Sequence, residues 1–279
     1  MINQKRIVAV HDISCLGKCS LTVALPVLSA AGHEVLAVPT AVLSTHTGGF
    51  KGFTFRDLTE DLIPIMRHWQ TLNLEYDAFY TGYLGSIKQV DIIGEMIQKL
   101  KTKNSLVFVD PVMADNGKLY TAFSDAFPDE MRHLCAQADI ICPNITEAAL
   151  LTKTDYKQGP FSRDYIETLL RKLSNLGPNK IILTGVFFEE KTLGAAYFDK
   201  GQTGYVFSDK IDGFFHGTGD VFASAFLGAY LKNHDTQKSL KIAVDFTAES
   251  ILRTKNDPYK RTYGVNFEAG LGDYALKTN

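Results

Sequence analysis

The sequence predicts an α/β fold with a mostly parallel central sheet, and two observations indicate it. Short runs of β-branched residues alternate along the chain with longer amphipathic segments. The runs are continuously apolar over four or five residues, which is typical of parallel strands that helices cover on both faces. Hydrophobic residues make up 45% of the 279 residues and charged residues 22%, an ordinary globular composition that argues against disorder.

Each short apolar run is an expected strand, and each segment with apolar residues at helical spacing is an expected helix. The expected strands are residues 7–10, 35–42, 78–80, 106–109, 140–142 and 181–183. The expected helices between them are residues 20–31, 58–69, 90–100, 131–135 and 166–173. The alternation of the two classes predicts helices on both faces of one sheet.

The pattern changes after residue 185. Residues 193–198 and 204–207 are expected to form two adjacent strands with Gly201 at the turn, a β-meander at one edge of the sheet. Two long helices, 221–231 and 240–252, follow. Because no linker, repeat or low-complexity segment interrupts the chain, we expect a single domain over residues 1–279.

Composition also argues against several classes of protein. A net charge of −2 gives no basic excess, so we expect no nucleic-acid partner. No apolar run approaches the roughly 18 residues of a membrane span, and the apolar stretch after Lys5-Arg6 is too short for a signal peptide. The four cysteines show neither C-x-x-C nor zinc-site spacing. We therefore expect a cytoplasmic protein with free thiols and no membrane association.

Ligands of open α/β sheets bind beyond the carboxyl ends of the strands, so the residues that follow each strand are the candidates for a site. Asp110 follows the strand at 106–109, where a carboxylate could hold Mg²⁺ directly or through water, or Asp110-Pro111 could simply end the strand. Asn144 follows the strand at 140–142 and predicts a helix cap, with Glu147 as its capping-box partner. Together Asp110 and Glu147 favour a metal–phosphate site at this edge.

The segment Gly217-Thr218-Gly219-Asp220 opens an expected helix and is the most informative one. Two glycines permit a tight turn whose N–H groups converge at a helix N-terminus, which favours an anion. Asp220 would stand beside that anion and could accept a proton from a substrate hydroxyl, or it could merely complement the helix dipole.

The two common nucleotide-binding loops are absent from the sequence. A P-loop would need glycine in place of Asp12 and serine or threonine in place of Cys19. The dinucleotide fingerprint fails as well, because Phe222 stands where its third glycine belongs.

Asn144-x-x-Glu147 followed by Gly217-Thr218-Gly219-Asp220, on an alternating α/β chain, resembles the ribokinase-like family of small-molecule kinases. The resemblance covers essentially the whole chain and implies a three-layer α/β/α sandwich. Four further segments are more similar to the pyridoxal (vitamin B6) kinases of that family. They are Ser44-Thr45-His46-Thr47-Gly48, Thr81-Gly82-Tyr83-Leu84-Gly85-Ser86, Asp110-Pro111-Val112-Met113 and Gly264-Val265-Asn266-Phe267-Glu268.

The resemblance implies phosphoryl transfer from ATP to the 5′-hydroxymethyl group of a B6 vitamer: pyridoxal, pyridoxamine or pyridoxine. Asp220 would be the general base, and the amides of Gly217, Thr218 and Gly219 would form the anion hole for the transferred group. The charge around Gly217 must then be met by these amides, by Mg²⁺ or by a more distant lysine such as Lys18.

The resemblance also implies the remaining ligand contacts. Asp110 and Glu147 would organise Mg²⁺ around ATP, Asn144 and Thr184 would approach the triphosphate, and the loop 115–120 would close over the reacting groups. Whether a monovalent cation is needed is left open. Homodimers are common among such kinases, so we expect a homodimer, with no interface located in the sequence.

The vitamer pocket would draw on Asp12, His46, Thr47 and Tyr83, since an aromatic ring and an imidazole suit a flat pyridine. Many pyridoxal kinases carry a serine where this chain has Asp12. A carboxylate there could favour a cationic amine substituent, which points to pyridoxamine or to a hydroxymethylpyrimidine.

Three alternatives stay open. A hydroxymethylpyrimidine kinase would share the fold, Asp220 and the anion hole, although the Thr45–Gly48 loop favours a B6 vitamer. A sugar kinase would carry an inserted lid sheet, for which residues 35–55 are too short. A non-catalytic vitamer-binding module would be expected to have lost Asp220.

Overall fold

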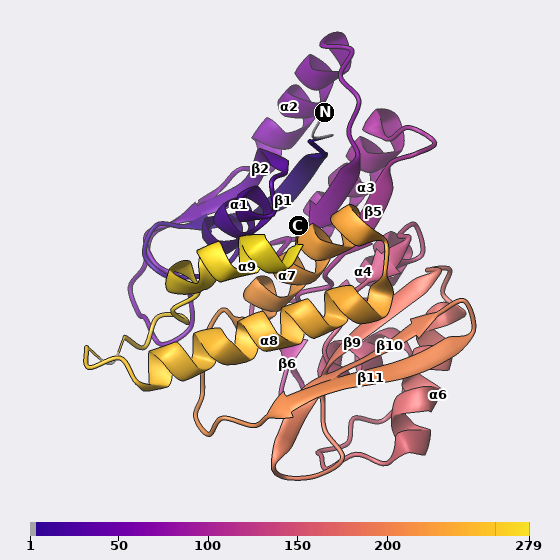
Figure 1. Cartoon of the computed structure of the whole chain (residues 1–279). Coiled ribbons are helices and arrows are strands. Elements are labelled where there is room, and N and C mark those ends of the chain that lie inside the picture. Colours follow the sequence, from indigo (N-terminus) through magenta and orange to yellow (C-terminus); the bar gives the residue numbers. More distant parts are fainter. Residues whose placement is uncertain (1–3, 260, 279) are drawn as a thin grey trace.

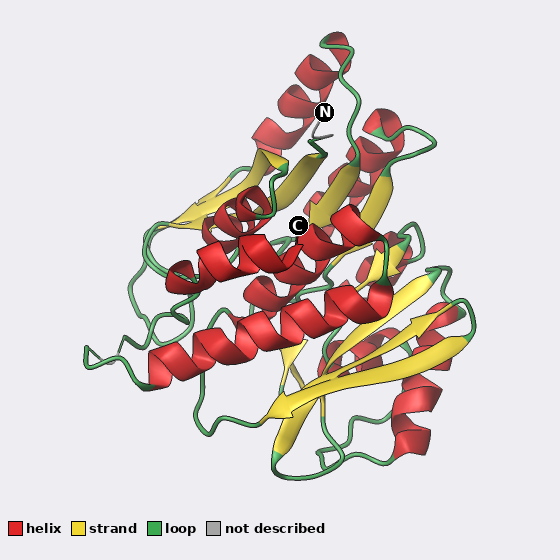
Figure 2. Ribbon diagram, in the orientation of Figure 1, coloured by secondary structure: helices red, strands yellow, loops and turns green. Residues whose placement is uncertain are grey.

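In the computed structural model, which describes residues 4–259 and 261–278, a nine-stranded sheet lies between two layers of helices (Figures 1 and 2). The strand order is β11-β10-β9-β8-β5-β4-β1-β2-β3. The strands are β1 (Arg6–Ser14), β2 (Glu34–Leu43), β3 (Phe55–Asp57), β4 (Ala78–Thr81), β5 (Leu106–Val109), β8 (Ile140–Ile141), β9 (Lys180–Val186), β10 (Thr192–Asp199) and β11 (Gln202–Asp209). A separate two-stranded hairpin consists of β6 (Ala114–Asp115) and β7 (Lys118–Leu119).

The centre of the sheet is parallel and its two edges are antiparallel. β1 pairs in parallel with β2 and β4, and the parallel pairing continues through β5 and β8 to β9. β3 runs antiparallel to β2, while β10 and β11 form an antiparallel meander against β9. The predicted mostly parallel sheet with an edge meander is therefore confirmed.

The helices are divided between the two faces of the sheet. They are α1 (Leu21–Ala30), α2 (Thr59–Thr71), α3 (Ile87–Leu100), α4 (Phe127–Cys135), α5 (Ile145–Leu151), α6 (Arg163–Ser174), α7 (Thr218–Asn233), α8 (Thr236–Lys255) and α9 (Leu271–Thr278), with a 3₁₀ turn at Glu268–Gly270. α1, α7, α8 and α9 pack together on one face, and α2 to α6 cover the other (Figure 1). Alternate residues of the strands enter two separate apolar cores, as in Val107 and Phe108.

Local sequence explains where several of these elements begin and turn. The Ser86 side chain accepts a hydrogen bond from the Gln89 N–H at 3.2 Å and caps α3. Asp235 caps α8 in the same way, accepting from the Lys238 N–H at 2.9 Å. Lys200 and Gly201 both have positive φ, 49° and 82°, which is the conformation that a tight hairpin between β10 and β11 requires.

The shortest elements were not predicted from the sequence. β3, the β6–β7 hairpin and α9 are each too short to show a clear period in the pattern of apolar residues. The segment 115–120 was expected to be a loop. In the structure most of it belongs to the β6–β7 hairpin, whose turn has positive φ at Asn116 and Gly117. β3 joins the main sheet beside β2, so residues 35–57 form no separate lid sheet.

The chain reverses direction across the sheet at β1. From β1 it passes first to β2 on one side and later to β4 on the other. Such a switch point opens a crevice at the carboxyl ends of the two strands. Asp12, near the end of β1, and Tyr83, just after β4, lie at this point.

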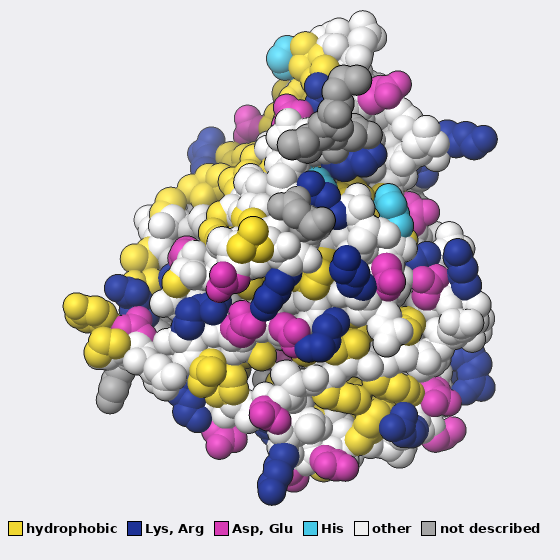
Figure 3. Space-filling model, in the orientation of Figure 1, with side chains coloured by type: hydrophobic (Ala, Val, Ile, Leu, Met, Phe, Trp, Pro, Cys, Tyr) yellow, Lys and Arg dark blue, Asp and Glu magenta, His cyan; other side chains and the backbone are white. Residues whose placement is uncertain are grey.

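On the face shown in Figure 3, basic and acidic side chains are interspersed. Within the described residues, no helix has both the length and the apolar character needed to cross a bilayer.

Candidate active site

The carboxyl edge of the sheet gathers most of the predicted site residues. Asp12, Tyr83 and Asp110 follow or end the neighbouring strands β1, β4 and β5. Asn144 and Thr184 continue the same edge, since they form a parallel bridge just beyond β8. The fold therefore brings together residues that are separated by more than 170 positions in the sequence.

The loop before α7 has the geometry that the two glycines predict. Gly217 caps α7 with a φ of 74°, and a Cβ atom there would lie 1.9 Å from the carbonyl oxygen of Lys18. No side chain caps the first N–H groups of α7. The amides of Thr218 and Gly219 thus stay available at the positive end of the helix dipole, which suits an anion.

Asp220, in the first turn of α7, has the electrostatics of a proton acceptor. The pKa of this carboxyl is raised from 3.8 to about 7. Burial is the main cause, a hydrogen bond from the Ser20 backbone N–H opposes the shift, and the nearby charge of Asp12 adds to it. A base with a pKa close to neutral combines a large deprotonated fraction with useful basicity. The position of Asp220 beside the free amides is therefore suited to proton abstraction next to an anion.

Asp110 and Glu147 form a buried acidic pair. Their exposed fractions are 7% and 3%. The pKa of Glu147 is raised to about 8, mainly by burial. Burial also raises the pKa of Asp110 well above its ordinary value, and the charges of Glu147 and Asp220 contribute to this shift. Among the described residues, no donor or cation faces the Asp110 carboxylate. A divalent cation would offset this concentration of negative charge, so the pair fits Mg²⁺.

Glu147 is held by backbone donors, which limits how it could meet a cation. Its two carboxylate oxygens accept hydrogen bonds from the N–H groups of Met113 at 3.1 Å and Asn144 at 2.8 Å. In return the Asn144 side chain accepts from the Glu147 N–H at 2.9 Å, so the predicted capping box is confirmed. The remaining lone pairs of Glu147 suit a water-mediated contact to a cation better than a fully direct one.

The β6–β7 hairpin is tied to the same corner of the site. The Asn144 side chain donates to the Ala114 carbonyl at 2.8 Å, and the Gly117 N–H donates to the Thr146 hydroxyl at 2.9 Å. Gly117 also packs against Tyr156, because a Cβ at Gly117 would lie 2.7 Å from its ring. The hairpin is therefore positioned beside Asp110 and Glu147 by α5.

Asp12 is buried at the other end of the site, with an exposed fraction of 5%. The hydroxyl of Ser20 donates to one of its carboxylate oxygens at 2.5 Å, and the hydroxyl of Ser14 donates to the other at 3.2 Å. Burial nevertheless raises the pKa of Asp12. Burial raises the pKa of the Tyr83 phenol, and the nearby charge of Asp12 raises it as well. The Tyr83 ring packs 5.6 Å from that of Phe123.

His46 lies across from the anion loop, and a second histidine faces it. The ring centroids of His46 and His216 are 5.0 Å apart. The Nδ1 atom of His46 accepts from the Gly48 N–H at 3.0 Å, while its Nε2 atom is buried without a partner. Burial lowers the pKa of both rings. Thr47, the third predicted residue of this loop, is exposed.

His216 was not identified from the sequence, although it directly precedes Gly217. Its ring contacts Gly48, since a Cβ at that glycine would lie 2.5 Å from it. The sequence offers one signal for His216, its position directly before the glycine loop. Its proximity to His46 could not be predicted, because it depends on how two loops that are distant in the sequence meet.

Lys18 does not offer a free charge to the anion loop. Its Nζ atom forms an ion pair with Glu268 at 2.7 Å, and only its backbone carbonyl contacts Gly217. Thr184 donates from its backbone N–H to the Pro143 carbonyl at 2.9 Å, which places its hydroxyl next to Asn144.

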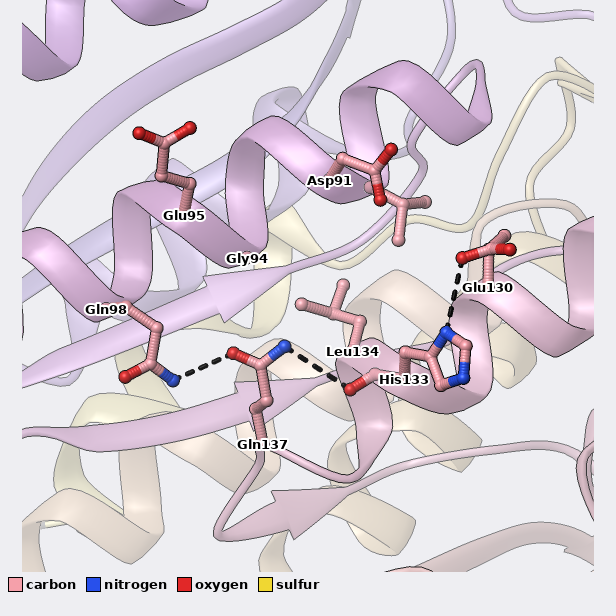
Figure 4. Close-up of a pocket in the computed structure, with 9 residues that line it drawn as sticks. Asp91, Gly94, Glu95, Gln98, Glu130, His133, Leu134 and Gln137 are labelled. Carbon is pink, nitrogen blue, oxygen red and sulfur yellow. Dashed lines mark hydrogen bonds and ion pairs between the residues drawn. The ribbon is translucent and has the colours of Figure 1, made fainter.

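A surface groove between α3 and α4 is separate from this site. Asp91 and Glu95 of α3 face Glu130 and His133 of α4, and a hydrogen bond joins His133 to Glu130 at 3.2 Å (Figure 4). None of the predicted site residues lines the groove. All four cysteines are free, and no cluster of three or more metal-binding side chains occurs in the part of the chain that the structure describes.

The chain is similar to known kinases over most of its length. The model of the phosphomethylpyrimidine kinase family matches residues 24–265. The pyridoxal kinase of Arabidopsis thaliana is 31% identical over 250 residues, which cover 84% of this chain and 77% of that protein.

Two solved structures share the fold along nearly the whole chain. A protein of Bacteroides thetaiotaomicron that is described as a phosphomethylpyrimidine kinase, solved with pyridoxal, is 36% identical with a TM-score of 0.92, over 98% of this chain and 96% of that one. The pyridoxal kinase of Lactobacillus plantarum is 32% identical with a TM-score of 0.89, over 98% and 97%. The predicted resemblance to ribokinase-like vitamin B6 kinases is confirmed.

Proposed function

The chain belongs to the phosphomethylpyrimidine kinase family, and we propose that it transfers the γ-phosphoryl group of ATP to the 5′-hydroxymethyl group of a vitamin B6 vitamer. The observation that carries this proposal is the position of Asp220, which combines a pKa of about 7 with the free amides of the Gly217 loop. Similarity to pyridoxal kinases over most of the chain supports the substrate class.

In the proposed reaction, the Asp220 carboxylate accepts the proton of the substrate hydroxyl. The oxygen freed in this way attacks the γ-phosphorus of ATP, the bond from that phosphorus to the β–γ bridging oxygen breaks, and ADP leaves. The amides of Gly217, Thr218 and Gly219 would stabilise the charge on the transferred group. Asp220 would later release the proton to solvent.

Asp110 and Glu147 would hold Mg²⁺, Glu147 through water because backbone donors already occupy its oxygens. A bound Mg²⁺ supplies charge neutralisation for the phosphates. Asn144 and Thr184 would lie next to the triphosphate, since they adjoin this pair at the end of β8 and β9. The β6–β7 hairpin would cover the reacting groups from the side of α5 and exclude water.

Asp12, His46, Thr47 and Tyr83 would form the vitamer pocket. His46 has a buried ring nitrogen without a partner, and its lowered pKa keeps the imidazole neutral, so it can exchange a hydrogen bond with a polar ring substituent. A relative that is 36% identical was solved with pyridoxal, which supports a pyridine ligand here. The carboxylate of Asp12 would favour a vitamer with a cationic amine, pyridoxamine above pyridoxine.

A second candidate substrate is a hydroxymethylpyrimidine. The family description and that of the Bacteroides thetaiotaomicron relative both name phosphomethylpyrimidine kinase. The reaction would be the same at Asp220, and only the ring and its substituents would differ.

The test is ADP release from Mg-ATP with pyridoxal, pyridoxamine, pyridoxine and hydroxymethylpyrimidine in parallel, with Asp220→Asn as the control. Turnover led by a B6 vitamer is the expected result. Turnover with the pyrimidine alone would replace the substrate and keep the mechanism. Stoichiometric binding of a vitamer without any ADP release would overturn the enzymatic proposal in favour of a binding module.

A further inference from the structure

Ser20, the residue before α1, has a backbone conformation that its side chain does not explain locally. Its φ is 52° and its ψ is −133°, outside the left-handed basin that non-glycine residues can reach. Glycine adopts such a conformation far more readily. Serine is a common helix cap, yet the Ser20 hydroxyl makes no capping hydrogen bond to α1. Neither backbone preference nor helix capping accounts for a serine here.

The contacts of Ser20 instead connect two carboxylates of the candidate site. Its hydroxyl donates to Asp12, and its backbone N–H donates toward Asp220. The exposed fraction of Ser20 is 6%, so both contacts are shielded from water. Its own carbonyl accepts from the N–H groups of Val23 at 3.0 Å and Ala24 at 2.9 Å, which fixes it to the start of α1.

The loop that carries Ser20 is also packed against the anion loop. The Lys18 carbonyl lies so close to Gly217 that a Cβ there would be 1.9 Å away, and the Lys18 N–H donates to the Tyr263 carbonyl at 3.0 Å. The end of β1, the start of α1 and the start of α7 are thereby held together around the two carboxylates. The Ser20 N–H faces Asp220 in this conformation, so the unusual φ and ψ belong to the arrangement.

We infer that Ser20 is a positioning residue for the phosphoryl transfer, acting through Asp12 with its hydroxyl and through Asp220 with its amide. The inference rests on the proposed function, in which Asp220 is the base. The hydroxyl holds Asp12 on the side of the pocket that receives the vitamer, while the amide orients the base. One residue therefore sets the position of the substrate-binding carboxylate relative to the catalytic one.

Three variants test the inference against a purely structural role. Ser20→Ala removes the hydroxyl and keeps the disfavoured backbone, whereas Ser20→Gly removes the hydroxyl and relieves it. Ser14→Ala removes the other hydroxyl that holds Asp12 but makes no contact with Asp220. Lys200→Gly is the matched control for backbone relief, since Lys200 has a φ of 49° in the exposed β10–β11 turn.

We expect both Ser20 variants to lower kcat by about tenfold, because loss of the hydroxyl bond to Asp12 removes the contact that holds the Ser20 backbone in place, so its amide no longer orients Asp220. Ser14→Ala should raise the vitamer KM and leave kcat within about twofold, because only the Asp12 contact changes. Ser20→Gly and Lys200→Gly should each melt no lower than the wild type, and Lys200→Gly should keep wild-type kinetics.

The kinetics are measured by ADP release and the melting temperature by circular dichroism. Wild-type kcat in Ser20→Gly would overturn the inference, as would an equal loss of kcat in Ser14→Ala. Absence of turnover in the wild type with every vitamer would instead contradict the proposed function, which is a distinct outcome.

Discussion

The site contains two groups of carboxylates that the fold stabilises in different ways. The Asp220 end consists of Asp220 and Asp12, whose donors are the amide of Ser20 and the hydroxyls of Ser20 and Ser14. The Glu147 end consists of Glu147 and Asp110. Backbone N–H groups hold Glu147, whereas the Asp110 carboxylate lies near the charges of Glu147 and Asp220 and meets no donor or cation of the described chain.

The difference separates the roles that the two ends can take. The pKa of about 7 at Asp220 suits a base that must exchange a proton near neutral pH. Burial raises the pKa of Glu147 to about 8 and also raises the pKa of Asp110, which favours the protonated form of the pair unless a cation is bound. Under the proposed function, the four acidic residues would divide into a proton-transfer end and a cation-binding end.

The largest effect should come from the Asp220 end. We expect Asp220→Ala to lower kcat by about 10²-fold or more, the contribution typical of a general base, while the melting temperature does not fall. Initial rates of ADP release with saturating vitamer measure the loss, and calorimetric titration with the vitamer checks that the pocket still binds. A variant with wild-type kcat would show that Asp220 is not the base.

At the Glu147 end we expect a change in cation dependence rather than in vitamer binding. Glu147→Gln can keep the capping box, so α5 should still form, but loss of the charge should raise the Mg²⁺ concentration for half-maximal activity by about tenfold. Titration of the rate with Mg²⁺ at fixed vitamer measures this shift. Glu60→Gln, at a side chain that is 85% exposed on α2, is the matched control. An unchanged Mg²⁺ requirement would remove Glu147 from the cation site.

A substitution at Asp12 tests whether the second member of the Asp220 end selects between vitamers. Asp12→Asn keeps the size of the side chain and removes its charge, so we expect kcat/KM for pyridoxamine to fall by about fivefold relative to pyridoxine. Parallel kinetics with the two vitamers give the ratio. If the ratio stays the same, Asp12 holds the pocket together without selecting the substituent.

The smallest effect concerns stability. The folded chain binds protons at Asp220 between pH 3.8 and about 7 and at Glu147 between pH 4.5 and about 8, where the unfolded chain has released them. Stability is therefore highest on the acidic side of this window and decreases as the pH rises through it. We expect the melting temperature of the metal-free protein to fall by several degrees between about pH 5 and 8.

Thermal denaturation across that pH range, with and without Mg²⁺, measures the decrease. Added Mg²⁺ should reverse much of it, since it binds the deprotonated pair. Asp220→Asn should flatten the pH dependence. A melting temperature that rises from pH 5 to 8 in the metal-free protein would contradict the raised pKa values at both ends.

The sequence predicted the central elements because their signals are local. Apolar runs gave the parallel strands, and the helical period gave the helices that cover them. The capping box of Asn144 and Glu147 was also predictable, since its two partners are three residues apart. Short elements such as β3 and the β6–β7 hairpin were missed because two or three residues carry no period.

His216 and Ser20 show the limit of reading the site from sequence. His216 faces His46 only because the loop before α7 meets the loop after β2. Ser20 stands at the start of an expected helix in the sequence, but in the structure its hydroxyl binds Asp12 and does not cap that helix. Contacts between residues so distant along the chain leave no pattern within either segment.

The sequence by itself determined the α/β class, the order of the elements, and the types of side chain that follow each strand. Only the tertiary structure decided which of those side chains meet, and it thereby set their protonation. Asp12, Asp110, Glu147 and Asp220 have ordinary carboxyl groups in the unfolded chain, and burial at one edge of the sheet raises the pKa of each. Desolvation and the distance between charges depend on packing, so only the folded chain sets the pKa values of these four carboxyl groups.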